Sequence, residues 1–239
     1  MPISKKQLIH YSLYFLAALL VALALLWYFQ QQGFIKVFPT SQEREIKKVL
    51  EIDESDFTPA NGLSPEVFQE RIQLLYKLRQ DVLADPENAQ PWFVFGNAKE
   101  FLNDHEGAIA AWKKTLEFQP QNFVAAANIA TNYQYFLRDF EQAEFYYYEA
   151  LSGSKAYTPA YQGLADLYQY SMPERKELFE PLLQDAAVND PKNAIPYYVS
   201  LVEFFAEEGD LTKAREYLQS VEEQKPDSAA QLRENYPEL

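Results

Sequence analysis

Residues 89–122, AQPWFVFGNAKEFLNDHEGAIAAWKKTLEFQPQN, decide the fold of this chain. The stretch holds two patterns with the period of a helix, because apolar side chains recur at spacings of three and four residues. Polar residues 103–106 separate the two patterns and predict a turn, and Pro120 ends the second pattern. Gly96 and Ala108 have very small side chains, which would let the two helices approach closely. The stretch therefore predicts a helix–turn–helix unit.

The order of large and small residues in this unit resembles the tetratricopeptide repeat. That repeat has the pattern W-x2-L-G-x2-Y, then A-x3-F, then P, over about 34 residues. The corresponding residues here are Trp92, Phe95, Gly96, Ala108, Trp112 and Pro120, and Lys99 departs from the pattern where an aromatic residue is usual. The resemblance implies an all-α protein built as a right-handed α-solenoid of stacked helix pairs.

The pattern recurs along the chain, and this matters because one match alone is weak evidence. A tetratricopeptide-repeat domain is expected at 64–239, with a cap helix at 64–88, repeats at about 89–122, 123–157, 158–194 and 195–228, and a terminal helix at 229–239. Ser64 before Pro65 predicts the start of the cap helix. The second repeat carries one inserted residue near Arg138. In the third, Pro181 should kink or shorten the second helix.

The N-terminal residues 1–29 are expected to form a basic tail and a transmembrane signal-anchor helix. Residues 8–29 contain no Asp, Glu, Lys or Arg, and at about 1.5 Å per residue they would span a bilayer. A cleaved signal peptide is the alternative, since residues 22–24 have the small-x-small form of a cleavage site, but the apolar run continues past them. We therefore expect a single-pass protein of the cell membrane.

The basic tail, with Lys5 and Lys6, favours a cytoplasmic N-terminus and an extracytoplasmic repeat domain. The positive-inside rule does not decide the orientation, because basic residues also follow the apolar run. Residues 30–63 are expected to form a juxtamembrane helix and an acidic linker. Thr40 followed by Glu43 has the form of a capping box and predicts a helix at about 41–52.

Composition argues against most enzyme classes. The chain has no Cys and two His, which leaves no thiolate nucleophile and no histidine-rich metal site. Its seven glycines form no phosphate-binding loop. Beyond the basic tail, 19 basic residues face 35 acidic ones, a net charge of −16 that disfavours binding of nucleic acid. We expect no catalysis, cofactor, metal or small-molecule substrate.

The resemblance implies a scaffold that binds a protein or peptide in a concave groove lined by the first helix of each repeat. The residues expected to face this groove are Phe93, Val94, Asn97, Phe101, Asn128, Thr131, Tyr135, Gln162, Asp166, Tyr170 and Glu203, with Val124, Val199 and Ser200 at equivalent positions. For any one aromatic residue, packing against the next repeat is the alternative. A fixed subunit of a membrane complex is the alternative function.

Some members of this family bind a C-terminal carboxylate through two Asn and several basic residues. Asn97 and Asn128 match the two Asn positions, whereas Phe93, Pro159 and Gly163 occupy positions expected to be basic. We therefore expect this carboxylate clamp to be absent.

Overall fold

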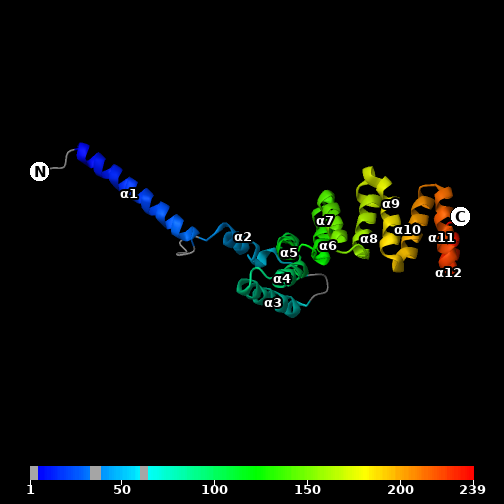
Figure 1. Cartoon of the computed structure of the whole chain (residues 1–239). Coiled ribbons are helices and arrows are strands. Elements are labelled where there is room, and N and C mark those ends of the chain that lie inside the picture. The colour runs from blue at the N-terminus through cyan, green and yellow to red at the C-terminus, as the bar shows by residue number, and fades with distance from the viewer. Residues whose placement is uncertain (1–4, 33–38, 60–63) are drawn as a thin grey trace. The chain divides into compact units, whose positions relative to one another are not determined.

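The computed structural model describes residues 5–32, 39–59 and 64–239 (Figure 1). The chain divides into two compact units, Met1–Glu51 and Ile52–Leu239. All regular elements of the described residues are helices. The fold of the described residues is therefore all-α, as the resemblance to the tetratricopeptide repeat implies.

The first unit contains α1 (Lys5–Gln31) and α2 (Ser41–Val49). The capping box predicted before α2 is present. The Thr40 hydroxyl accepts a hydrogen bond from the Glu43 amide at 3.0 Å, and the Glu43 carboxylate accepts one from the Thr40 amide at 2.8 Å. Each partner satisfies a backbone group that the helix itself leaves open, which explains why the helix starts there.

The membrane anchor and the cell-membrane location predicted from the sequence are corrected by the structure. Within the described ranges, no helix combines the length and the apolar character that crossing a membrane requires. The expectations about orientation no longer apply.

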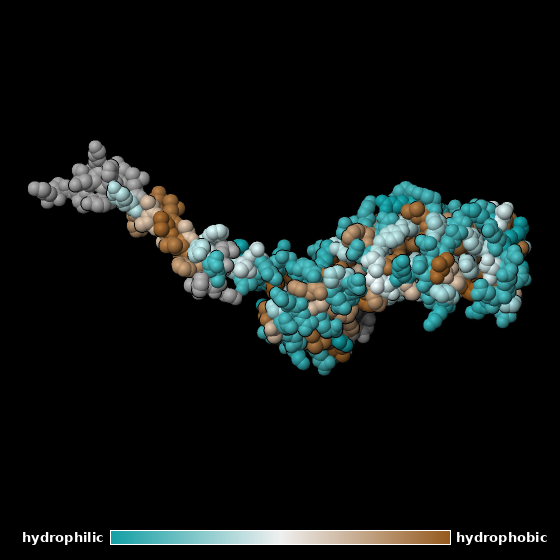
Figure 2. All heavy atoms as spheres, viewed as in Figure 1, coloured by the Kyte–Doolittle hydropathy of each residue, from teal (hydrophilic) through white to brown (hydrophobic). Residues whose placement is uncertain are grey.

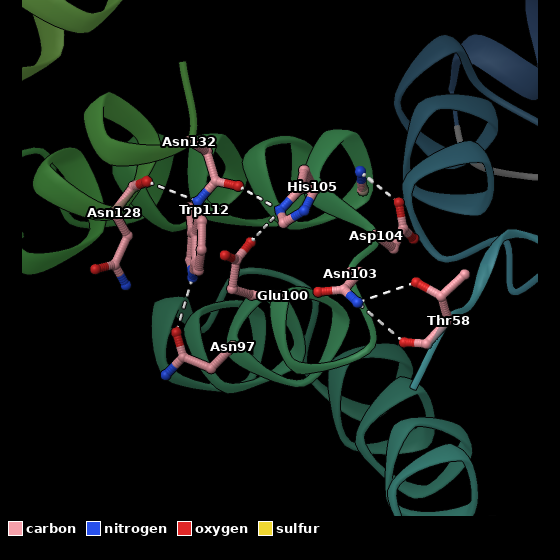
Figure 3. A network of polar contacts seen from close by, with 10 residues as sticks. Thr58, Asn97, Glu100, Asn103, Asp104, His105, Trp112, Asn128 and Asn132 are labelled. Carbon is pink, nitrogen blue, oxygen red and sulfur yellow. Dashed lines mark hydrogen bonds and ion pairs between the residues drawn. The ribbon is translucent and has the colours of Figure 1, made fainter. Parts of the chain in front are cut away.

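The second unit begins with a short 3-10 helix, η1 (Glu54–Asp56), and with α3 (Pro65–Ala84). The Ser64 hydroxyl accepts a hydrogen bond from the Val67 amide, which confirms the predicted start of the cap helix. Residues 57–58 belong to the predicted acidic linker, and both contact the rest of this unit. Phe57 is buried, and the Thr58 carbonyl and hydroxyl oxygens accept hydrogen bonds from the Asn103 amide at 3.1 and 3.0 Å (Figure 3).

Helix pairs follow α3, and each helix packs against the next along the chain (Figure 1). The first helices of the pairs are α4 (Ala89–Phe101), α6 (Phe123–Asn132), α8 (Thr158–Asp166) and α10 (Ala194–Glu207). The second helices are α5 (His105–Phe118), α7 (Phe140–Gly153), α9 (Phe179–Asn189) and α11 (Leu211–Gln224), and α12 (Pro226–Asn235) packs on α11.

Small residues set the distance between packed helices, as predicted for Gly96. A Cβ atom on Gly96 would lie 2.6 Å from the Trp112 indole ring, so only glycine allows this approach of α4 to α5. Gly163 has the same role against Tyr147, where the corresponding distance is 2.1 Å. Close packing at these two points buries the large rings of both second helices.

Two first helices end in π-helical turns, η2 (Tyr133–Leu137) and η3 (Leu167–Ser171). A π-turn accommodates an extra residue within a helix, which accounts for the insertion predicted near Arg138. That residue ends η2 in the left-handed conformation, at φ 57°. After η3, the 3-10 helix η4 (Pro173–Leu178) precedes α9. Pro181 lies in the first turn of α9, where a missing amide hydrogen costs little, and α9 is short as expected.

The buried core runs through the stack of helix pairs. Ala108, Trp112 and Ile129 belong to a cluster shared by the first two pairs, and a larger cluster continues from α6 to α12. Figure 2 shows apolar side chains along α1 and a mostly hydrophilic surface over the helix pairs. The apolar sides of the helix pairs therefore cover one another.

Candidate functional site

A cavity of about 190 Å³ opens between the third and fourth first helices, α8 and α10. Polar side chains and apolar ones contribute to its wall. The lining residues are Thr158, Gln162, Ala165, Asp166 and Gln169 from α8 and η3, Phe179 and Leu183 from α9, and Asn193, Pro196, Tyr197 and Ser200 from the start of the fourth pair. The cavity therefore lies on the face formed by the first helices, which we call the first-helix face.

A buried carboxylate, Asp190, lies behind one wall of this cavity. It is 6% exposed and accepts hydrogen bonds from Thr158 (2.6 Å), Asn193 (2.8 Å) and the Tyr197 hydroxyl (3.2 Å). The hydrogen bonds from Thr158 and Asn193 hold the pKa of Asp190 below its usual value. Burial, which is opposed by a hydrogen bond with Thr158, raises the pKa of Tyr197 to about 12. Asp190 is therefore ionised at neutral pH, and its partners stay neutral.

Asp166 connects the cavity to the second helix pair. Its carboxylate accepts a hydrogen bond from the Tyr135 hydroxyl, which lies on η2, at 3.0 Å. Burial and this hydrogen bond raise the pKa of Tyr135, so the tyrosine remains a donor. The ring of Tyr135 is nevertheless 51% exposed. The contact thus joins two successive first helices while it leaves an aromatic surface open to solvent.

The first two pairs carry a polar network along the same series of helices (Figure 3). The Trp112 indole N–H donates to the Asn97 side-chain oxygen at 3.0 Å. The His105 Nδ1 atom lies 3.0 Å from the Glu100 carboxylate and 2.9 Å from the Asn132 side-chain oxygen. Asn132 in turn donates to the Asn128 backbone oxygen at 3.0 Å. The hydrogen bond from Trp112 occupies the side-chain oxygen of Asn97. Asn97 is exposed, so its side-chain NH2 group can reach a ligand.

The other predicted groove residues take several environments. Phe93 is half-buried and packs against the core cluster of the first two pairs, whereas the ring of Tyr170 is 72% exposed. Phe101 is 36% exposed, and the Arg71 guanidinium of α3 lies over its ring at 4.5 Å. The Thr131 hydroxyl lies 3.4 Å from the Tyr147 hydroxyl. Val94, Asn128 and Glu203 are partly buried.

Three predicted residues, Gln162, Asp166 and Ser200, meet in the cavity between α8 and α10. Among the groove residues, sequence reasoning missed the other polar lining residues, Thr158, Gln169, Asn193 and Tyr197, and the apolar ones, Ala165, Phe179, Leu183 and Pro196. The sequence signal nearest to these residues is the boundary between the third and fourth repeats, predicted at about 194–195. That signal predicts a connection between helices and says nothing about the cavity beside it.

Together, the tandem helix pairs, the glycines at helix crossings and the first-helix face define an α-solenoid of the tetratricopeptide-repeat fold. The chain is similar to a crystal structure of MamA, with 17% identity, a TM-score of 0.54, and coverage of 73% of this chain and 95% of that one. It is also similar to the MamA RS-1 ArsTM double mutant, with 19% identity, a TM-score of 0.52, and coverage of 71% and 92%.

A structure of YrrB, described as a TPR protein with an unusual peptide-binding site, gives 21% identity, a TM-score of 0.49, and coverage of 66% and 82%. No protein-family model matches the chain, and no curated protein matches it. At identities below 25%, the likeness to the two MamA structures establishes the fold alone.

Proposed function

We propose that this protein is a scaffold that binds a segment of another protein along its first-helix face. The observation that carries the proposal is the cavity between α8 and α10, whose lining residues come from two successive first helices. A binding surface assembled from neighbouring repeats is the usual way in which solenoid proteins recognise an extended partner. The proposal includes the four repeats at about 89–122, 123–157, 158–194 and 195–228, and the predicted groove residues on their first helices.

The side chains on this face suit a peptide. Tyr135 and Tyr170 are exposed aromatic residues that follow α6 and α8, and aromatic residues are the commonest hot spots of protein interfaces. Asn97 and Gln162 are exposed amides, which can pair with the backbone of an extended segment. The proposal assigns no catalytic step to any of these residues.

The proposal is tested by selecting peptides from a displayed random library on the immobilised full-length protein. Affinities of selected peptides are then measured for the wild type, Tyr135→Ala and Tyr170→Ala. We expect each substitution to weaken binding at least tenfold, or about 1.4 kcal/mol. Phe145→Ala is the matched control, because Phe145 is 54% exposed on a second helix, α7. Peptides that tolerate both tyrosine substitutions but lose affinity with the control would place the binding surface on the second helices.

A further inference from the structure

We propose that the cavity between α8 and α10 is a subsite for a cationic side chain, Lys or Arg, of the bound segment. The inference rests on the proposed function, since it specifies the chemistry of the segment that the first-helix face binds. It adds one requirement to the proposed function, namely a positive charge at one defined place in the partner.

The lining of the cavity offers acceptors and no competing cation. Asp166 supplies a carboxylate, and Gln162 and Gln169 supply side-chain oxygens. Among the described residues that line the cavity there is no Lys, Arg or His. The one hydrogen bond to the Asp166 carboxylate comes from Tyr135, a neutral donor, so its charge has no ionic partner among the described residues. A carboxylate with amide neighbours is suited to a guanidinium or ammonium group.

Asp190 strengthens the negative potential inside the cavity from a second direction. Its carboxylate is buried, and its three side-chain hydrogen-bond partners are neutral. The exposed Lys192 also lowers the pKa of Asp190, but its effect is smaller than that of the hydrogen bonds. A buried charge without an ionic partner keeps its field in the surrounding low-dielectric region. Thr158, Asn193 and Tyr197 separate this charge from the cavity, so a ligand would sense the field without touching Asp190.

Glu203 extends the acidic surface along α10. It follows Ser200 by three residues and therefore lies on the same side of the helix. Burial, and then the neighbouring Glu207, raise the pKa of Glu203, which means that its charged form is disfavoured in the free protein. A cation brought by the partner would relieve that cost. The charge complementarity thus favours a basic segment over an acidic or neutral one.

The apolar part of the cavity wall would contact the methylene groups of a Lys or Arg side chain. Phe179 and Leu183 of α9 and Ala165 of α8 contribute apolar surface to the cavity. The methylene stem of a long basic side chain packs on such surface while its charged end reaches polar groups. A small metal ion would not use this surface, and a carboxylate would meet Asp166 with the same sign of charge.

The test compares peptides selected on the full-length wild type with peptides selected on Asp166→Asn. Asparagine keeps an oxygen that accepts from Tyr135 but removes the charge. We expect wild-type selections to carry Lys or Arg at one fixed position, and Asp166→Asn selections to lose that preference. Calorimetry then measures the affinity of the best peptide and of the same peptide with Gln at that position. For the wild-type protein, the Gln peptide should bind at least tenfold more weakly. For Asp166→Asn, the two affinities should differ by less than threefold.

Glu149→Gln is the matched control, because it removes one charge from an exposed position on α7 and should leave the preference intact. Gln162→Lys is a second variant, at an exposed position, that places a cation at the cavity and should abolish the preference without depending on Asp166. Peptides that bind through Tyr135 and Tyr170 without a basic position, or a preference that survives both variants, would overturn the inference and leave the proposed function standing. Failure to select any peptide would count against both.

Discussion

The Tyr135 hydroxyl donates a hydrogen bond to the Asp166 carboxylate at 3.0 Å, and this contact links the second helix pair to the third. Both residues lie on the first-helix face, and Asp166 also lines the cavity between α8 and α10. A tyrosine that approaches an acid in this way holds it in position without neutralising it. The arrangement keeps a carboxylate available to a ligand while two neighbouring repeats stay in register.

Substitution of an aromatic residue should affect either binding or stability, depending on whether its ring is exposed or buried. Tyr135→Ala and Tyr170→Ala remove exposed rings, so the free energy of unfolding should fall by less than about 1.5 kcal/mol, the loss expected for one hydrogen bond. Trp112→Ala removes a ring that is 1% exposed, and should cost about 3–5 kcal/mol. Urea unfolding of the full-length variants measures both. Tyrosine variants that unfold like the Trp112 variant would be core residues, contrary to their proposed role.

Gly96→Ala should destabilise the protein even though alanine favours helices. A helical Gly→Ala change with free space stabilises by about 1 kcal/mol, but the new Cβ would lie 2.6 Å from the Trp112 ring. Overpacking of this kind costs about 1–3 kcal/mol. The control is the same change in a Trp112→Leu background, where the smaller side chain should remove most of the cost. Equal costs in both backgrounds would mean that another neighbour sets the limit at Gly96.

Asp190 should make stability depend on pH in the acid range. Hydrogen bonds lower its pKa in the folded protein below the unfolded value of about 3.9. Its contribution is therefore fully present above the unfolded pKa and is lost as the pH falls through the folded pKa. Asp190→Asn should be less stable than the wild type at pH 7 by about 1–3 kcal/mol, because an uncharged amide oxygen would replace the carboxylate oxygen that accepts all three hydrogen bonds.

That stability difference should be smaller at about pH 3 than at pH 7, because pH 3 lies below the unfolded pKa of about 3.9. Chemical denaturation at both pH values tests the prediction. Asp185→Asn, at an exposed position of α9, should show no such dependence. A difference between wild type and Asp190→Asn that stays constant with pH would show that the charge of Asp190 is not what its hydrogen bonds stabilise.

Glu203 should make the folded protein less stable as the pH rises, whereas Asp190 makes it less stable as the pH falls. Burial, followed by repulsion from Glu207, raises its pKa in the folded protein. The charged form is thus penalised, and the penalty grows as the pH rises from the unfolded pKa of about 4.3 through the folded value. Glu203→Gln should therefore raise the melting temperature at pH 7 and change it little at pH 4. A lower melting temperature at pH 7 would mean that Glu203 has a stabilising partner in the free protein.

Local signals in the sequence were sufficient to predict the helix pairs. Thr40 and Ser64 begin helices because their hydroxyl groups accept from amides three residues ahead, and such a contact needs no distant partner. The small residue at Gly96 and the short helix after Pro181 follow from equally local geometry. Composition was not sufficient at the N-terminus. The apolar run there predicted a membrane-spanning helix, but no helix in the described part of the chain is both long and apolar enough to cross a membrane.

The sequence alone determined the class of fold, because repeat spacing, helix caps and apolar periodicity each act within a few turns of the chain. Only the tertiary structure decided which side chains share a site. Asp166 and Ser200 lie far apart in sequence, and they line the same cavity because α9, which contributes Phe179 and Leu183 to the wall, packs against both α8 and α10. Burial of Asp190 depends on the same packing, since its donors come from two helix pairs. No local pattern encodes such a distance, which is set by how successive pairs stack.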